Sequence, residues 1–368
     1  MNIVIDARMI GDRMHGIARY TYNIVKNLLK IDLENQYTVL IGKEFPGISV
    51  EANNLKMRPL RSRWISISEQ WELVKVLKEL KPDLYHAPSF VAPVFNPFPM
   101  VMTIHDLNHL AFASNYSMYH AIYYRFVVKP SARKSIKIIT GSEFSRKEIS
   151  KYLSVPEEKI KVIPYGCSGK FRLIEDKEEL RRVRRKFSIP EAFILYVGAY
   201  KFHKNLFNLF RSYANLSPEI PLVLSGNGNK ELRSLSKRLG IERRIIFIGD
   251  IQDDDLPAVY NSAVLFVFPS LYEGFGLPPL EAMACGCPVV VSNVASLPEV
   301  CGDAAYYVDP YNVESIAEGI HKVLTDEFLR QSMIEKGLER AKLFSWEKSA
   351  REHIKVFEDI LSSEGRGK

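Results

Sequence analysis

The amino-acid sequence predicts an α/β protein made of two doubly wound domains, each a parallel sheet covered by helices on both faces. Short apolar runs alternate with helical stretches along the whole chain, which is the pattern of parallel sheets. These runs form two series of equal size. The chain has 368 residues, which is too many for one typical core and suits two domains of ordinary size.

The predicted strands can be placed from their apolar runs. The first series comprises residues 2–6, 37–41, 83–86, 100–104, 136–140 and 161–164, and the second comprises 193–198, 221–225, 245–249, 265–268, 288–292 and 305–308. The segment P-Y-G-C-S-G at 164–169 separates them, and its proline and glycines mark a bend. We therefore expect domains at 1–166 and 167–345, followed by an amphipathic helix in the segment 346–368.

Composition limits the classes of partner. The apolar and charged fractions, 46% and 25%, are those of a soluble globular protein. A formal charge of +7 favours an acidic partner, which leaves nucleic acid, anionic lipid and substrate phosphates as candidates. The basic residues match no zinc finger, basic zipper or RNA-recognition module, so we expect no nucleic-acid partner.

Targeting signals and cysteine spacing add further expectations. No apolar run approaches the roughly 20 residues that span a bilayer, and the N-terminus enters a strand without signal-peptide features. We expect a cytoplasmic protein. The four cysteines suggest no disulfide framework, and the C-x-C pair Cys285 and Cys287 has no second metal-binding pair nearby. No zinc site is therefore expected at this pair, and small side chains buried at a helix end are the better account.

The most informative stretch is Y-E-G-F-G-L-P-P-L-E-A-M-A-C-G-C-P at 272–288, which follows a buried-type apolar run. Gly274 and Gly276 form a turn, and a helix with Pro278 and Pro279 near its start runs to a stop at Gly286. Such a unit directs backbone N–H groups and a helix dipole at one point, which suits a phosphate.

Two carboxylates bracket this turn. Glu273 precedes it and Glu281 is expected on the first helical turn, where both can accept hydrogen bonds from neutral hydroxyls. The implied ligand carries a diphosphate flanked by two polyols, as a nucleotide sugar does. On the residues alone, glycines that only shape the turn and a Glu281 that only favours the helix remain an alternative.

The phrase E-G-F-G-L-P-P-L-E-A-M-A-C-G-C-P-V-V resembles the signature of the family-four retaining glycosyltransferases, among them bacterial mannosyltransferases of surface polysaccharide assembly. The resemblance implies the GT-B fold, with two Rossmann-like domains facing each other across a cleft and a last helix that returns to the first domain. It implies that Glu273 contacts the donor sugar and Glu281 the ribose. The diphosphate would lie on the backbone of Gly274, Phe275, Gly276 and Leu277.

The second domain offers further donor-site candidates. A lysine past a strand end can neutralise a leaving diphosphate, and Lys204 has this place. The segment from Gly198 to Asn205 resembles the family's G-x-x-x-x-R-K-N, which implies donor contacts for Gly198, Lys204 and Asn205. His203 stands where arginine is usual, so Lys201, a protonated His203 or no group supplies the second cation. A surface lysine without a role is the alternative for Lys204.

The resemblance also places the nucleotide base near Gly249 and Ile251, at another strand end. The acidic triplet at 253–255 could hold a divalent cation. Because it precedes a predicted helix at 256–261, we expect it to cap that helix, and we expect no metal there.

In the first domain, T-I-H-D-L at 103–107 puts a histidine just past a strand end. On the residues alone, a structural role is as plausible as a reactive one. The family's similar segment implies that His105 lies against the donor sugar, with Asp106 orienting it or the acceptor. G-I-A-R-Y resembles a family loop that implies a donor contact for Gly16 and none for Ala18. A structural role is expected for His86, His109 and His120.

Residues 55–81 are basic and aromatic. Trp71, Val74, Leu77 and Leu80 follow helical spacing between 65 and 80, so part of this stripe is expected in the core. A basic rim beside an exposed tryptophan would suit an anionic membrane. A solvated basic helix face is the alternative.

Together these features predict a retaining, metal-independent glycosyltransferase. It would move a hexose, with mannose from GDP-mannose as the leading donor, to a glycan or lipid-linked acceptor in cell-surface polysaccharide or lipopolysaccharide biosynthesis. His105, Lys204 and Glu273 are the expected catalytic residues. Alternatives are a UDP-dependent glucosyl, galactosyl or N-acetylglucosaminyl transferase, a nucleotide-sugar 2-epimerase and a non-enzymatic anion-binding protein.

Overall fold

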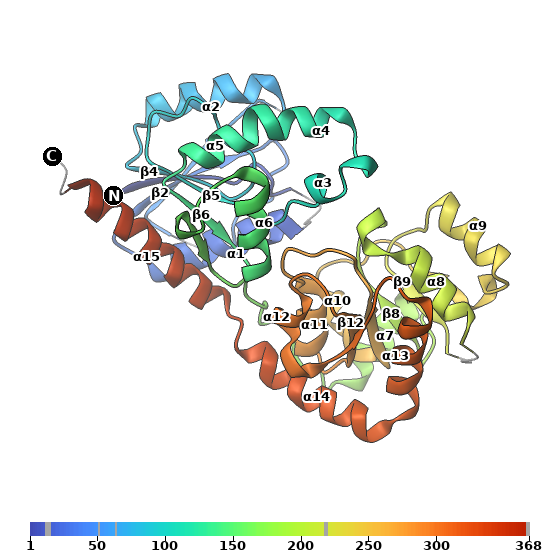
Figure 1. Cartoon of the computed structure of the whole chain (residues 1–368). Helices are drawn as coiled ribbons and strands as arrows, with labels where there is room; N and C mark the ends of the chain where they lie inside the picture. Colours follow the sequence, from blue (N-terminus) through green and yellow to red (C-terminus); the bar gives the residue numbers. More distant parts are fainter. Residues whose placement is uncertain (12–15, 51, 63–64, 217–219, 366–368) are drawn as a thin grey trace. The chain divides into compact units, whose positions relative to one another are not determined.

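The structure is a computed structural model that describes residues 1–11, 16–50, 52–62, 65–216 and 220–365 (Figure 1). The chain forms two compact units: unit 1 is Met1–Gly166 with Ser345–Lys368, and unit 2 is Cys167–Phe344. The first crossing coincides with the predicted division after residue 166. The return to unit 1 begins at Ser345, one residue before the expected segment 346–368.

Among its described residues, unit 1 contains a seven-stranded parallel sheet in the order β3-β2-β1-β4-β5-β6-β7. The strands are β1 (Asn2–Asp6), β2 (Gln36–Ile41), β3 (Leu55–Pro59), β4 (Leu84–Ala87), β5 (Met100–Thr103), β6 (Lys137–Thr140) and β7 (Ile160–Val162). The chain runs outward from β1 in one direction and from β4 in the other. The loops after β1 and β4 therefore separate at a topological switch point, where such sheets bind ligands.

Strand β3 was not predicted. It lies at the edge of the sheet, beside β2, and four of its five residues are exposed. An exposed edge strand has no apolar run to reveal it, and it tolerates the proline at its end. The basic sequence of this segment is thus the surface of a strand.

Helices cover both faces of the unit 1 sheet. They are α1 (Gly16–Ile31), α2 (Ile67–Leu80), α3 (Asn108–Ala111), η1 (Ala113–Asn115), α4 (Met118–Tyr123), the π-helix η2 (Tyr124–Val128), α5 (Lys129–Lys134), α6 (Glu143–Leu153), η3 (Glu157–Lys159) and α15 (Trp346–Gly365). Residues of α2, η2, α5 and α6 share one core cluster with the sheet. The returning helix α15 packs on α1.

One of the two expectations for these helices was wrong. The sequence predicts a first helix from about Tyr20 to Leu29, whereas α1 begins four residues earlier, at Gly16. The expectation that part of the stripe on α2 lies in the core is confirmed, because Leu77 is buried and Leu80 packs against the core. Trp71 is 75% exposed, since an i, i+3 spacing drifts around a helix of 3.6 residues per turn.

Among the described residues, unit 2 contains a six-stranded parallel sheet in the order β10-β9-β8-β11-β12-β13. The strands are β8 (Ile194–Tyr196), β9 (Leu222–Leu224), β10 (Ile245–Phe247), β11 (Leu265–Phe268), β12 (Val289–Ser292) and β13 (Ala305–Val308). All six follow the predicted second series. Here the switch point lies between β8 and β11. The prediction of two doubly wound α/β domains is confirmed.

The helices of unit 2 complete this second fold. They are α7 (Lys177–Lys186), η4 (Phe202–Lys204), α8 (Leu206–Ala214), α9 (Lys230–Arg238), η5 (Glu242–Arg244), α10 (Leu256–Ser262), α11 (Leu277–Ala284), α12 (Leu297–Cys301), η6 (Gly302–Ala304), α13 (Val313–Thr325) and α14 (Glu327–Lys342). Within the described part of the chain, no helix is both long and apolar enough to cross a bilayer.

Candidate functional site

The glycine turn lies at the switch point of unit 2, between the buried strand β11 and helix α11. Gly276 caps the helix with a φ of +114°. A Cβ at this position would lie 2.8 Å from Leu297 Cδ2. The turn therefore needs glycine at 276 for its backbone angle and for its close packing.

Helix α11 presents few N–H groups of its own. Pro278 and Pro279 have none, and the Leu280 N–H is directed at the Gly276 carbonyl at 3.4 Å. Of the first four helical residues, only Leu277 can therefore offer an N–H to a ligand. This arrangement moves the donors for an anion into the turn before the helix.

Ser296, which the sequence did not single out, fixes the orientation of that turn. It is fully buried, and its Oγ lies 2.9 Å from the Glu273 carbonyl oxygen and 2.7 Å from that of Phe275. Each carbonyl shares a planar trans peptide group with the next N–H. The N–H groups of Gly274 and Gly276 therefore point away from Ser296, together on the opposite side.

The charged pair of this site is Lys204 with Glu273. Lys204 Nζ lies 2.6 Å from Glu273 Oε1, and the two side chains are 14% and 12% exposed. The same Nζ lies 4.9 Å from the centre of the Phe268 ring, at the end of β11. Loops that follow β8 and β11 thus bring together a cation and a carboxylate from positions 69 residues apart.

The neighbours of Lys204 have structural partners. Asn205 takes left-handed backbone angles, and its Nδ2 donates to the carbonyls of Pro269 at 3.0 Å and Pro310 at 2.7 Å. Its donor-binding role stays a prediction. His203 is buried and its carbonyl accepts the Leu271 N–H, whereas Lys201 is exposed.

Glu281 lies in the second turn of α11, because the helix starts at Leu277. Its expected place on the first turn was wrong. The residue is buried, and its Oε2 accepts the Tyr260 hydroxyl at 3.3 Å. Burial, with the nearby Glu281 carboxylate as a smaller cause, raises the pKa of the Cys167 thiol.

At the other glycines predicted for the donor site, the backbone lies close to neighbouring groups. A Cβ at Gly198 would lie 2.8 Å from the Tyr196 hydroxyl. Gly249, with a φ of +71°, exchanges two backbone hydrogen bonds with Gly226. Ile251 follows as a half-buried residue, and its predicted base contact is untested.

The acidic triplet at 253–255 forms ion pairs. Asp255 precedes α10 but makes no side-chain capping bond, contrary to expectation. It lies 2.6 Å from Lys186 and 3.5 Å from Arg182, and Asp253 lies 3.3 Å from Lys170. Across the described ranges, no three His, Cys, Asp or Glu residues group as metal ligands.

In unit 1, His105 follows β5 and has a partner at each ring nitrogen. Nε2 lies 2.9 Å from the Pro88 carbonyl and Nδ1 lies 2.6 Å from the Tyr165 hydroxyl. Because a carbonyl only accepts, Nε2 carries hydrogen and donates to Pro88, while the Tyr165 hydroxyl is the partner of Nδ1. Burial raises the pKa of Tyr165 well above its usual value, so this hydroxyl stays protonated.

Tyr165 lies next to the first crossing between the units. Its ring stacks on Trp346, at an interplanar angle of 10°, just after the second crossing. A Cβ on Gly166 would collide with the Trp346 backbone nitrogen at 2.1 Å, so the two crossing segments pack backbone to backbone. His105 is therefore fixed by a residue that belongs to this junction.

The remaining unit 1 predictions have mixed outcomes. The Asp106 carboxylate accepts two hydrogen bonds from Asn108, at 2.6 and 3.0 Å. Its expected role in orienting His105 or the acceptor stays a prediction. Gly16 is the exposed first residue of α1, with open space where a Cβ would stand. Residues 12–15 of its predicted loop lie outside the described residues.

The structural role expected for His86 is confirmed. Its Nε2 lies 2.9 Å from Thr103 Oγ1, which is 3.1 Å from the Tyr20 hydroxyl. That hydroxyl is 2.7 Å from Nε2 of His353 on α15. Burial lowers the pKa of His86 well below its usual value and that of His353 to about 4. This network ties the returning helix to the sheet.

Comparison with known proteins adds independent information. Residues 176–340 match the family described as "Glycosyl transferases group 1", and residues 14–168 match "Glycosyltransferase Family 4". The O-antigen chain mannosyltransferase B of Escherichia coli is 32% identical over 380 residues, which cover 97% of this chain and 99% of that protein.

Solved structures resemble the fold at low sequence identity. Sucrose-phosphate synthase from Thermosynechococcus elongatus has a TM-score of 0.80 at 20% identity, and covers 98% of this chain and 99% of its own. HepE from Anabaena, in complex with UDP and glucose, has a TM-score of 0.77 at 17% identity and covers 98% and 100%. Both likenesses support the GT-B type of fold.

Proposed function

The chain belongs to the family-four, or group 1, glycosyltransferases, and on that premise we propose that it is a retaining mannosyltransferase. The donor would be GDP-mannose, and the acceptor a glycan or lipid-linked intermediate of surface polysaccharide or lipopolysaccharide assembly. The Escherichia coli relative is an O-antigen chain mannosyltransferase, which supports the sugar and the class of pathway. A UDP-hexose is the alternative donor, since HepE is described with UDP and glucose.

The observation that carries this proposal is the Lys204–Glu273 pair beside a glycine turn oriented by Ser296. The N–H groups of 274, 276 and 277 would hold the diphosphate, which the cation would neutralise. Glu273 would then accept hydrogen bonds from the sugar. Glu281, in the second turn of α11, would contact the ribose.

We further propose that Lys204 changes partner during the reaction. In the structure it balances the Glu273 carboxylate at 2.6 Å. A diphosphate carries more negative charge than one carboxylate, so it would compete for the ammonium group and release Glu273 to the donor hydroxyls. This exchange neutralises the leaving group with a side chain and backbone N–H groups, and no metal is required.

Retention would follow from a same-face displacement. The bond from the anomeric carbon to the diphosphate oxygen breaks, the acceptor oxygen bonds to the same face, and the departing phosphate takes the acceptor proton. His105, held in place by Tyr165 and Pro88, would shape the sugar side of the site. A covalent glycosyl adduct on a carboxylate would contradict this mechanism.

The test is transfer from GDP-mannose and from UDP-hexoses, with chelator present, followed by NMR of the anomeric configuration in the product. We expect mannose transfer that withstands the chelator and keeps the donor configuration. Transfer from UDP-hexoses alone would replace the proposed donor. Inversion, or activity only with added metal, would overturn the mechanism.

A further inference from the structure

We propose that one face of unit 1 docks on an anionic lipid surface. The face consists of the outer side of α2, residues 92–95, and the continuous helical run 118–134 made by α4, η2 and α5; we call it the α2–α5 face. This inference goes beyond sugar transfer, and it uses no residue of the donor site.

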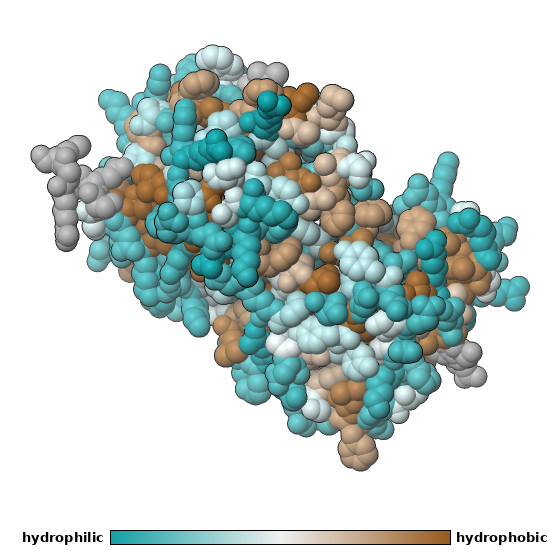
Figure 2. All heavy atoms as spheres, in the orientation of Figure 1, coloured by the Kyte–Doolittle hydropathy of each residue, from teal (hydrophilic) through white to brown (hydrophobic). Residues whose placement is uncertain are grey.

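Large apolar side chains gather on this face. Those at least half exposed are Trp71 (75%), Phe95 (76%), Met118 (78%), Tyr119 (50%), Ile122 (50%) and Phe126 (62%). Figure 2 shows tan and brown spheres collected over the part of unit 1 where Figure 1 draws α4. Single exposed apolar residues are ordinary, but a cluster of this kind marks an interaction surface.

The helical run 118–134 has two distinct sides. Its inner side supplies Tyr123, Tyr124, Val128 and Ala132 to the core. On its outer side, Met118, Ile122 and Phe126 recur every four residues and so lie along one line. Three basic residues, Lys129, Arg133 and Lys134, follow in the second half of the run. The run thus exposes an apolar half followed by a basic half.

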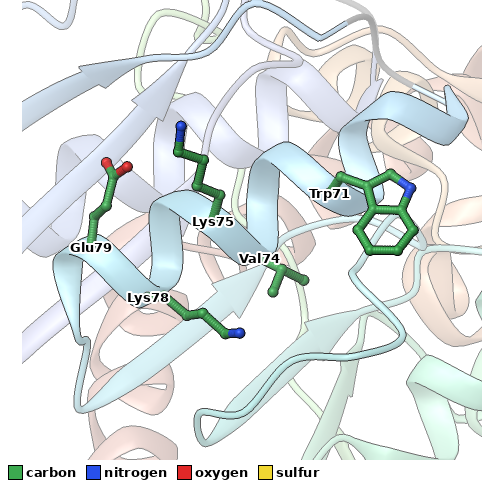
Figure 3. A pocket seen from close by; sticks show the side chains of 5 residues that line it. All are labelled: Trp71, Val74, Lys75, Lys78 and Glu79. Carbon is green, nitrogen blue, oxygen red and sulfur yellow. The ribbon is translucent and has the colours of Figure 1, made fainter.

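Helix α2 presents a second mixed surface. Trp71, Val74 and Lys78 point to one side of the helix and Lys75 and Glu79 to the other, around a shallow hollow (Figure 3). The carboxylates on α2 already have partners: Glu69 binds Arg8, Glu72 accepts backbone N–H groups, and Glu79 pairs with Arg58. Lys75 and Lys78 are exposed on the same helix, so cationic side chains border the apolar surface around Trp71.

Hydrogen bonds hold the two helices side by side. Tyr123 donates to Glu69 Oε1 at 3.0 Å, and the Tyr119 hydroxyl reaches the Ile65 carbonyl at 3.3 Å. Between the two helices, Lys134 Nζ donates a hydrogen bond to the Val94 carbonyl at 3.1 Å. The same Nζ lies 5.0 Å from the centre of the Phe95 ring. These contacts make one continuous face from three chain segments.

The charge of the face selects its partner. From residue 107 to 142 the sequence has no Asp or Glu and five Lys or Arg residues. Aromatic and aliphatic side chains interleaved with long cationic ones suit a bilayer, where the apolar groups enter the boundary and the lysines reach anionic headgroups. A lipid surface satisfies both groups at once.

This placement would serve a lipid-linked acceptor. The run 118–134 belongs to the connection from the carboxyl end of β5, which also carries His105. A membrane bound to the α2–α5 face would concentrate lipid-linked acceptors around unit 1. The membrane contact does not depend on the identity of the sugar.

The test is co-sedimentation of the full chain with phosphatidylcholine vesicles, with and without phosphatidylglycerol, in the absence of donor. We expect binding only with phosphatidylglycerol, weakened by salt. The pair Ile122→Ser with Phe126→Ser should weaken it at least about tenfold. The pair Lys78→Ala with Arg125→Ala should weaken it roughly 20- to 30-fold.

Matched controls use unit 2. Phe328→Ser removes a side chain that is 91% exposed on α14, and Lys230→Ala removes an exposed cation on α9; both should bind vesicles as wild type does. Nucleotide binding, read by thermal shift, should be unchanged in every variant. That readout separates failure of the docking proposal from failure of the donor site.

Two outcomes would overturn the proposal. The first is equal binding to vesicles with and without phosphatidylglycerol, or wild-type binding by the Ile122→Ser, Phe126→Ser variant. The second is that wild type binds no vesicles and instead forms a concentration-dependent dimer in sedimentation, which the Ile122→Ser, Phe126→Ser variant does not form. The face would then be an interface between copies of the chain.

Discussion

The switch point of unit 2 is built largely from backbone, whereas the candidate region of unit 1 is built from side chains of distant segments. In unit 2, one turn of adjacent residues presents its N–H groups, and Ser296 orients it from behind. In unit 1, His105 depends on Tyr165, 60 residues away, and on Pro88, 17 residues away.

The difference suggests a division of labour. Backbone N–H groups cannot change identity by mutation, so they suit the diphosphate that every donor of this class would share. Side-chain contacts vary freely, so they suit a surface that must fit a particular acceptor. We therefore expect substitutions in the 274–277 turn of unit 2 to affect donor binding and those in unit 1 to affect transfer alone.

The largest expected effect is that of Lys204→Ala. Removing the cation at the leaving group should lower kcat about 100- to 1,000-fold. Lys230→Ala, at an exposed position of the same unit, is the matched control and should retain wild-type kcat. Steady-state transfer assays decide between them, and a similar kcat for both variants would remove Lys204 from the mechanism.

The pH dependence of stability tests the buried side chains of unit 1. His86 and His353 are buried as neutral rings, and the pKa of His353 is lowered from 6.5 to about 4. Between these values the unfolded chain binds more protons than the folded one. Unfolding free energy should therefore fall as the pH drops from about 6.5 to 4, by ~3 kcal/mol for His353.

Urea denaturation followed by tryptophan fluorescence can measure this loss, because all three tryptophans belong to unit 1. His353→Gln removes the titrating group from α15, so its unfolding free energy should depend less on pH. An unchanged pH dependence in this variant would show that His353 is not the source.

A smaller effect is expected for Tyr165→Phe, which removes the hydrogen bond to His105 Nδ1. Loss of about one hydrogen bond predicts a roughly tenfold fall in kcat with unchanged donor affinity. NMR of the His105 ring should show a changed tautomer ratio, which a merely structural role of Tyr165 would not produce.

The control for that variant is Tyr213→Phe, which removes a buried hydroxyl bound to the Ile220 carbonyl in unit 2. Tyr213→Phe should lose about as much stability as Tyr165→Phe, but its kcat should stay that of wild type. If both variants lower kcat equally, or if donor affinity falls in Tyr165→Phe, His105 is not positioned through this contact.

The contrast between local features and contacts of distant side chains also explains what could be predicted from the sequence. The apolar runs of twelve strands and the turn at 274–277 are local features, and both were predicted. The edge strand β3 was missed because it is exposed and has no apolar run. The sequence predicted that only part of the stripe at 71–80 lies in the core, but the structure was needed to show that Trp71 is the exposed member.

The positioning residues could not be predicted from local motifs. Ser296 lies 23 residues after Glu273, in a segment that reads as an ordinary helix start. Tyr165 was visible only as part of the bend between domains. Both act through contacts that the chain makes only after folding.

The most direct test of the backbone site is calorimetric titration with GDP and GMP, with chelator present, on wild type, Gly276→Ala and Glu281→Ala. We expect GDP to bind wild type more tightly than GMP, because the turn holds the second phosphate. Gly276→Ala should bind GDP no more tightly than GMP. Glu281→Ala should bind both nucleotides more weakly but still prefer GDP. Gly169→Ala, in open space, is the folding control. If Gly276→Ala still preferred GDP over GMP as strongly as wild type does, the backbone site would be contradicted.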